Sequence, residues 1–262
     1  MKPCDDNNDA LLAALARWYR SPLGRYVAAA EQRCLARLLG DEFGRYLVQI
    51  GVPDQFAAAV AASRLRHRVV LGGVSDAAWA GGVRATPHLP IEGVADALPL
   101  ESAGVDVLFL PHSLDISSAP RQVLREVERV LIPNGRVILF GFNPISAWGL
   151  TRWMPRPAPR VPWCGEQLTA FRIGDWLNVL GIEVERREML MFRPPVRGAL
   201  SPRLDWLDRL GGRYWPALGG VYGIVAIKRV LPLTPLRPAW SATPALVPGG
   251  AVEPTARESG HV

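Results

Sequence analysis

Two polar side chains that can do chemistry stand close to one apolar run of this chain. His112 lies two residues after the run Val105–Leu110, and Asp96 precedes the same run. A histidine exchanges protons near neutral pH, and a carboxylate accepts hydrogen bonds from an amino group. His112 is therefore a candidate general base, although its ring could equally stack on a bound ligand or hydrogen-bond to backbone.

The elements around His112 can be predicted from the pattern of apolar residues. Val105–Leu110 is typical of a strand that is buried on both faces of a parallel sheet. A helix is expected next, because apolar residues recur at helical spacing after Pro120, a residue that a first turn tolerates. Ser118 is expected to cap this helix and Pro133-Asn134-Gly135 to end it.

A second buried strand, Val137–Phe140, is predicted after this helix. A strand-helix-strand crossover of this length is almost always right-handed, with its two strands parallel. His112 would then lie at the carboxyl edge of the sheet, where open α/β sheets bind their ligands.

Further strands are predicted on both sides of this unit, over Tyr46–Gly51, Arg68–Leu71, Pro90–Val94, Ile182–Met191 and Tyr222–Lys228. Thr169 can cap a helix that precedes the fourth of these runs, and Gly181 can close it. The chain therefore alternates strands and helices, which is typical of the α/β class.

Three stretches of sequence resemble one protein family. They are DALPL (residues 96–100), VDVLFLPHSLD (105–115) and LREVERVLIPNGRVILFGFNP (124–144). Together they are similar to the second half of a class I S-adenosylmethionine-dependent methyltransferase domain of the type 11 subgroup. The likeness extends more weakly over residues 40–230, and residues 17–39 resemble the N-terminal extension of a bacterial branch of such proteins.

The resemblance implies a Rossmann-like architecture. We expect a seven-stranded, mostly parallel sheet with an antiparallel last strand, helices on both faces and an N-terminal helical extension. The expected divisions are a helical extension over residues 1–40, a methyltransferase-like domain over 41–230 and a disordered tail over 231–262, which is rich in Pro, Ala and Gly.

The resemblance also implies a cofactor, S-adenosylmethionine. In the family, the acidic residue at the position of Asp96 bonds the adenine amino group, and the residues after it contact the ring. The residues assigned to the cofactor site in this way are Gly51, Asp54, Asp76, Asp96, Ala97, Leu98, Pro111 and His112.

The first half of the chain departs from the family pattern. Gly51 is the one glycine left of the usual two or three, Gln49 stands where a carboxylate is common, and Pro53 lacks an amide donor. The run Arg68–Leu71 ends in glycine and not in the acid that usually binds the ribose. Asp76 is then the nearest candidate, and a solvated loop acid is the alternative reading of it.

Composition limits the class of protein. The chain has 262 residues, enough for one α/β domain with extensions, and no apolar run of the length that spans a bilayer. With its polar start, this indicates a cytoplasmic protein. Cys4, Cys34 and Cys164 show no metal spacing, so we expect free thiols, no disulfide and no metal.

The charge is positive, at +6, and all but two of the 30 basic residues are arginine. Guanidinium groups suit phosphate contacts, but these arginines are spread along the whole chain. A solvated basic surface is favoured, and nucleic acid is permitted as a partner without being favoured.

Two aromatic regions flank the predicted sheet. Residues 9–39 are expected to form two helices with a break at Ser21-Pro22-Leu23-Gly24, and in the family such helices lie across the substrate entrance. The alternative is that they only cap the sheet, and Trp18 and Tyr19 are the candidates to face a substrate. For the tryptophans of residues 148–163 we expect packing in the core. The alternatives are a lid over a substrate and contact with a membrane surface.

Two functions from different classes follow. The first is methyl transfer from S-adenosylmethionine to a small-molecule acceptor, with His112 as a weak candidate base. The alternative is a catalytically silent methyltransferase-like domain that binds a partner or nucleotide, suggested by the altered loop 51–55. A nicotinamide-dependent oxidoreductase has no motif here. The sequence carries no signal for the acceptor or the oligomeric state.

Overall fold

The computed structural model describes residues 8–51, 54–72, 89–150, 168–194 and 205–229. The chain divides into one unit of residues Met1–Val230 and a second of Leu231–Val262, and all of the described residues belong to the first.

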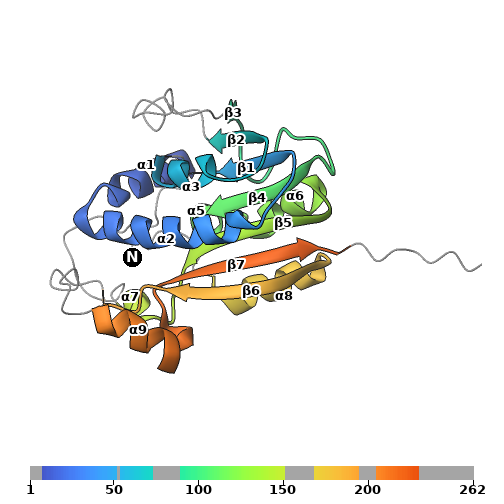
Figure 1. Cartoon of the computed structure of the whole chain (residues 1–262). Coiled ribbons are helices and arrows are strands. Elements are labelled where there is room, and N and C mark those ends of the chain that lie inside the picture. Colours follow the sequence, from blue (N-terminus) through green and yellow to red (C-terminus); the bar gives the residue numbers. More distant parts are fainter. Residues whose placement is uncertain (1–7, 52–53, 73–88, 151–167, 195–204, 230–262) are drawn as a thin grey trace, which may run out of the picture. The chain divides into compact units, whose positions relative to one another are not determined.

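A seven-stranded sheet forms the centre of this unit (Figure 1). Its strands are β1 (Tyr46–Ile50), β2 (His67–Gly72), β3 (Leu89–Glu92), β4 (Val105–Pro111), β5 (Leu131–Phe142), β6 (Ile182–Leu190) and β7 (Val221–Lys228). They lie in the order β3-β2-β1-β4-β5-β7-β6. The strands from β3 to β5 pair in parallel, and β7 runs antiparallel to both β5 and β6. The expected mixed sheet with an antiparallel last strand is confirmed.

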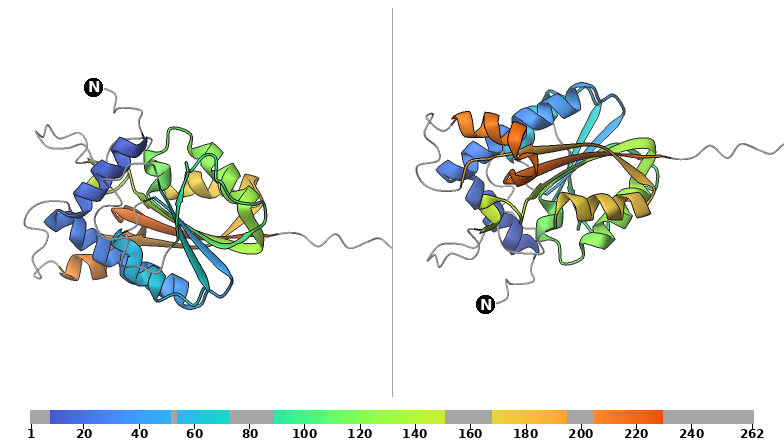
Figure 2. Two further views of the ribbon diagram at one scale, coloured as in Figure 1. Left: turned by 90° about the horizontal axis from the view of Figure 1, so that it is seen from above. Right: turned by 90° about the horizontal axis from the view of Figure 1, so that it is seen from below.

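Helices cover both faces of this sheet (Figure 2). They are α1 (Asn8–Tyr19), α2 (Pro22–Gly40), α3 (Ala57–Ala61), α5 (Ser113–Ile116), α6 (Pro120–Val130), α7 (Ala147–Leu150), α8 (Ala170–Val179) and α9 (Asp205–Tyr214), with the 3-10 turns η1 (Asp54–Phe56) and η6 (Pro216–Leu218). The apolar side chains of α6 and α8 pack on one face with the β4 and β5 residues that point that way. Those of α2 and α3 pack on the other face.

The helix boundaries follow from local sequence, with two corrections. Thr169 caps α8 as predicted, because its hydroxyl accepts from the Arg172 amide at 3.2 Å. The cap of α6 is Ala119 and not Ser118, and no side chain accepts a capping hydrogen bond from the first turn of the helix. Since α6 ends at Val130, Pro133-Asn134-Gly135 does not close the helix but lies within β5, where the register with β4 shifts.

The two N-terminal helices break where the sequence predicts. Ser21 caps α2, because its hydroxyl accepts from the Gly24 amide at 3.0 Å, and Pro22 takes the first helical position. The start of α2 and the whole of α1 meet the carboxyl edge of the sheet through a third apolar cluster, which includes Leu15, Phe142 and Trp148.

Trp148 confirms the predicted core packing for its own side chain. It is 2% exposed, and its indole N–H donates to the Arg193 carbonyl at 2.6 Å. Trp153 and Trp163 lie outside the described residues. No helix in the described ranges is long and apolar enough to cross a membrane.

Candidate functional site

A cleft opens at the carboxyl edge of the sheet, where β1, β2, β3 and β4 end. The residues that line it are Leu12, Ile50, Gly51, Leu71, Gly72, Gly93, Val94, Ala95, Ser113, Ile116 and Ser117. Glycine ends or follows each of the first three strands here, so backbone is accessible between apolar walls. Such a surface suits a ring system held by apolar contact and by backbone hydrogen bonds.

Gly51 makes the turn at the centre of the cleft. Its φ is +107°, a backbone conformation that glycine adopts without strain, and its amide donates to the Leu71 carbonyl at 2.9 Å. A Cβ added at Gly51 would lie 3.2 Å from the Ser113 hydroxyl and 3.7 Å from Leu12. Because both of these residues also line the cleft, any side chain here would fill it.

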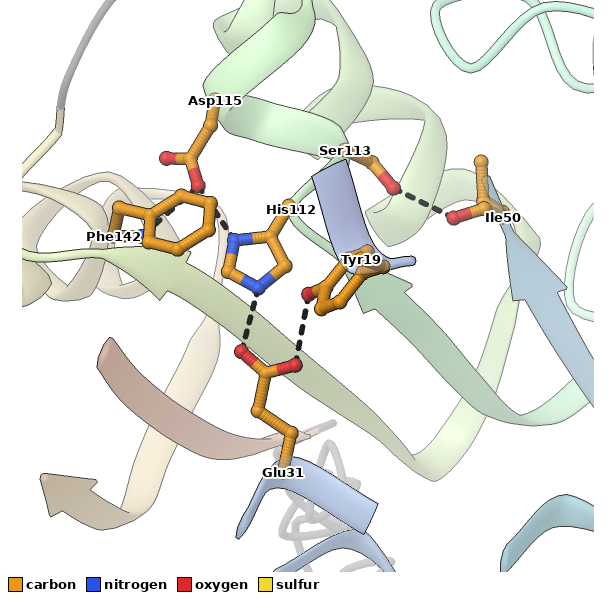
Figure 3. Close-up of polar contacts among 7 residues, drawn as sticks. All are labelled: Tyr19, Glu31, Ile50, His112, Ser113, Asp115 and Phe142. Carbon is orange, nitrogen blue, oxygen red and sulfur yellow. Dashed lines mark hydrogen bonds and ion pairs between the residues drawn. The ribbon is translucent and has the colours of Figure 1, made fainter. Parts of the chain in front are cut away.

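A buried ionic network lies directly behind the cleft, centred on His112 (Figure 3). The His112 ring is fully buried, with Nδ1 2.9 Å from Asp115 Oδ2 and Nε2 2.9 Å from Glu31 Oε1. The Tyr19 hydroxyl donates to the other oxygen of Glu31 at 2.8 Å. The ring also stacks on Phe142, with centroids 4.0 Å apart. We call Tyr19, Glu31, His112 and Asp115 the His112 network.

The His112 network joins three parts of the chain. Tyr19 ends α1, Glu31 lies in α2, and His112 follows β4, while Asp115 Oδ2 also accepts from the Phe142 amide at the end of β5 at 3.0 Å. The adjacent Ser113 hydroxyl donates to the Ile50 carbonyl at 2.6 Å. The network therefore fixes the N-terminal helices and the ends of β1, β4 and β5 to one another beside the cleft.

Charge in this network favours a protonated histidine. Burial opposes the charge on the ring, but Glu31 and Asp115 outweigh it and raise the pKa of His112 to about 9. Burial raises the pKa of Asp115, although His112 acts in the opposite direction. Burial is the largest cause that raises the pKa of Tyr19 well above its usual range, and the negative charge of Glu31 raises it further. Both ring nitrogens therefore carry a proton and donate to a carboxylate at neutral pH.

Comparison with known proteins finds a family model that matches part of this chain. The family described as a methyltransferase domain matches residues 48–139. The uncharacterized protein YafS of Escherichia coli (strain K12) is 36% identical over 152 residues, which cover 56% of this chain and 58% of that protein. A ubiquinone/menaquinone biosynthesis C-methyltransferase, UbiE of Rubrivivax gelatinosus, is 27% identical over 118 residues, or 45% of this chain and 47% of that one. The chain thus spans about half the length of these curated relatives.

Solved structures agree with the family match. The crystal structure of an S-adenosylmethionine-dependent methyltransferase from Thermotoga maritima has a TM-score of 0.62 to this chain at 16% sequence identity. The likeness covers 85% of this chain and all of that one. This is a class I methyltransferase fold. The type 11 resemblance read from residues 96–144 is thereby confirmed.

The methyltransferase fold brings some of the predicted cofactor residues to the cleft and leaves others away from it. Gly51 lines the cleft. Ala95 also lines it, and Asp96 is the next residue along the chain. Leu98 is buried in the core and its amide donates to Glu126, while Ala97 and Pro111 are not among the lining residues. Asp76 and the side chain of Asp54 lie outside the described residues.

The structure corrects the roles considered for two aromatic rings. His112 does not reach the cleft, because its ring is enclosed and both nitrogens bond carboxylates. In this structure the ring contacts Glu31 and Asp115, and His112 is not among the described residues that line the cleft. Tyr19 does not face a substrate either, since it is 2% exposed and bonded to Glu31. Trp18 packs edge to face against Phe142 and Trp148.

Sequence analysis missed Glu31, Asp115 and Leu12. Glu31 did carry a signal, because it occupies a core position of α2: it is four residues after Val27 and four before Leu35, and both are buried. A carboxylate at such a position needs a buried partner. Leu12 gave no comparable signal, since α1 could equally have capped the sheet without meeting the cleft.

Proposed function

We propose that this chain transfers a methyl group from S-adenosylmethionine to a small-molecule acceptor. The observation that carries the proposal is the cleft at the ends of β1 to β4, which lies within the methyltransferase fold and exposes backbone at Gly51, Gly72 and Gly93. Open α/β sheets bind their ligands at this edge.

The residues present fit such a cofactor. The space that a Cβ at Gly51 would fill is left free beside Ser113 and Leu12, so the main chain can approach a ligand closely. The apolar side chains of Ile50, Leu71 and Val94 would flank the adenosyl part. Asp96, together with Asp54 and Asp76, is the proposed source of carboxylate contacts to the adenine amino group and the ribose.

Bound S-adenosylmethionine supplies an electrophilic methyl group, so the protein needs mainly to align an acceptor and to exclude water. Leu12 of α1 lies over the cleft and would contribute to the exclusion. The His112 network would hold α1 and α2 in this position. Acceptor alignment, and not proton abstraction by His112, is then the proposed contribution of these helices.

A relative indicates which class of acceptor to propose. UbiE is a C-methyltransferase of ubiquinone/menaquinone biosynthesis. We propose an apolar small molecule, and a quinone precursor ring is the first compound to test. The described residues that line the cleft support this choice, since none of their side chains is charged.

Calorimetric titration tests cofactor binding directly. Saturable binding of S-adenosylmethionine and of its demethylated product would support the proposal. No heat of binding at millimolar concentration of either would overturn it.

Asp96 provides a sharper test of the site. Asp96→Ala should weaken cofactor binding by about 1–3 kcal/mol, because a buried adenine amine would lose a charged acceptor. The control is Asp175→Ala, which removes an exposed carboxylate from α8. An Asp96→Ala protein that binds as tightly as the control would remove the adenine assignment.

A second candidate function is a catalytically silent domain that binds a partner through the same fold. The observation that favours it is that no carboxylate is among the described residues lining the cleft, although a ribose is usually bound by one. The two candidates differ in calorimetry. A silent domain gives no response to cofactor, whereas a methyltransferase binds it even before its acceptor is known.

A further inference from the structure

The helix α9 joins β6 to β7 at the carboxyl edge of the sheet, and one of its faces is firmly anchored. A Cβ at Gly211 would collide with Phe192, so this glycine permits close packing of α9 on the chain after β6. Asp208 binds the same stretch, since it accepts from the Phe192 amide at 3.0 Å and pairs with Arg193 at 2.6 Å. It also accepts from Tyr26 of α2 at 3.1 Å. The orientation of α9 is thereby fixed.

The opposite face of α9 is apolar and exposed. Trp206, Leu210 and Tyr214 recur at a spacing of four residues and therefore form one stripe along the helix. Trp206 is 50% exposed and Tyr214 63%. The following residues extend this surface, since Trp215 is 56% and Leu218 44% exposed. A contiguous group of large apolar side chains in water usually marks an interaction site.

A second segment adds to this surface. The Asn143 side-chain amide donates to the carbonyls of Ala217 and Gly219 at 2.8 and 2.9 Å. These two hydrogen bonds hold the loop before α7 against η6. Ile145 in that loop is exposed. We call Ile145, Trp206, Leu210, Tyr214, Trp215 and Leu218 the α9 patch.

Exposed positive charge lies on α9 and on the part of α2 that is bonded to it. Arg213 in the last turn of α9 is exposed, and so is Arg25, which neighbours the Tyr26 that bonds Asp208. Asp208 is the one carboxylate among the described side chains of residues 205–218, and it is engaged with Arg193. Exposed arginines around an apolar aromatic surface complement anionic headgroups above a hydrocarbon layer.

From this arrangement we propose that the α9 patch is a membrane-docking surface for anionic lipid bilayers. Tryptophan and tyrosine suit the interface, because their rings bury apolar area while their polar ends remain hydrated. A short helix with its polar face bonded to the protein and its apolar face outward can lie in the plane of the headgroups. The patch lies at the same edge of the sheet as the cleft, so docking would bring the cleft toward the bilayer.

Vesicle co-sedimentation of the full chain tests this proposal. The parent should bind vesicles of phosphatidylcholine with phosphatidylglycerol, and bind vesicles of phosphatidylcholine alone much more weakly. The double variant Trp206→Ser with Trp215→Ser should lower the partition coefficient about tenfold or more, because it removes the two large exposed side chains that would enter the bilayer. The matched control is Phe43→Ser with Val179→Ser, two exposed apolar residues outside the patch, which should bind like the parent.

Charge is tested separately. Arg25→Gln with Arg213→Gln should weaken binding to anionic vesicles roughly tenfold or more, because each arginine near an anionic surface contributes favourably to binding. Arg45→Gln with Arg66→Gln removes the same charge from exposed residues outside the patch and should have little effect.

Three results would overturn the proposal. One is a parent that stays in solution with anionic vesicles, and another is an unchanged partition of the tryptophan variant. The third is a parent that is oligomeric without lipid and becomes monomeric on Trp206→Ser with Trp215→Ser, which would assign the patch to a second copy of the chain. These measurements need neither cofactor nor acceptor, so their outcome is independent of the proposed methyl transfer.

Discussion

Gly51 is the residue on which the cleft depends most directly. Gly51→Ala should lower the free energy of unfolding by about 1–3 kcal/mol, because an alanine is strained at its φ of +107°. It should also weaken S-adenosylmethionine binding at least about tenfold, or 1.4 kcal/mol, since the Cβ would enter the cleft. Denaturant titration and calorimetry measure the two effects.

Gly40→Ala is the control for this substitution. Gly40 ends α2, and a Cβ there would meet nothing within 4 Å. Alanine should therefore be neutral or slightly stabilising, and cofactor binding should not change. If Gly51→Ala bound the cofactor as tightly as Gly40→Ala, the cleft would not be the cofactor site.

His112 should make the stability of the protein depend on pH. Its pKa is about 9 in the folded protein and about 6.5 when unfolded, so the folded state holds the proton more tightly. The resulting stabilisation is complete below about pH 6.5 and is lost as the pH rises through about 9. The free energy of unfolding should fall by up to about 3 kcal/mol over this range.

Denaturant titrations across this range check the prediction, with His112→Asn as the comparison. Asparagine tolerates the left-handed backbone of this position, where φ is 57°, but carries no titrating ring. The variant should be less stable at pH 6.5 and should show a much smaller loss toward about pH 9. An equal loss in parent and variant would assign the pH dependence to other groups.

At the scale of elements, Glu31 attaches α2 to the end of β4. Glu31→Ala should lower the free energy of unfolding by about 3–5 kcal/mol, because it leaves the buried His112 charge with one carboxylate fewer. Amide hydrogen exchange should show the loss of protection first in α1 and α2, which the network holds in place. Unchanged exchange in these helices would contradict the positioning role.

Two other variants test whether the effect comes from the buried contact between Glu31 and His112 or from the loss of any carboxylate. Glu183→Ala removes an exposed carboxylate paired with Arg229 and should change stability little. Glu31→Gln keeps a hydrogen-bonding side chain of the same size and should be less harmful than Glu31→Ala. A larger effect of Glu183→Ala than of Glu31→Ala would mean that the burial of Glu31 is not what matters.

At the scale of the whole molecule, the folded unit should not need the end of the chain. The last strand, β7, ends at Lys228, and Arg229 pairs with Glu183. A chain truncated after Val230 should therefore unfold in one transition at the midpoint of the full chain. Limited proteolysis of the full chain should yield a product of similar length, and a lower midpoint for the truncated chain would contradict the predicted tail.

The sequence by itself determined the sheet. Val137–Phe140 is apolar at every position, and Val105–Leu110 at every position but Asp106. Such runs are typical of strands covered on both faces, so a parallel sheet between helices followed from local pattern. The break between α1 and α2 was also predictable, because Ser21 and Pro22 act through bonds within one turn. Of the residues predicted at strand ends, Gly51 is among those that line the cleft.

The tertiary structure decided what the polar residues do. His112 and Glu31 are 81 residues apart in the chain, and no local pattern pairs them. Only the packing of α2 across the ends of β4 and β5 brings the Glu31 carboxylate to the His112 ring. This contact makes His112, a candidate base in the sequence, a buried cation. In the same way, Trp148 and Trp206 both lie near the start of a helix, yet Trp148 is 2% and Trp206 50% exposed. Burial is a property of the assembled fold, because it depends on which distant elements cover a side chain, and the sequence alone does not specify that cover.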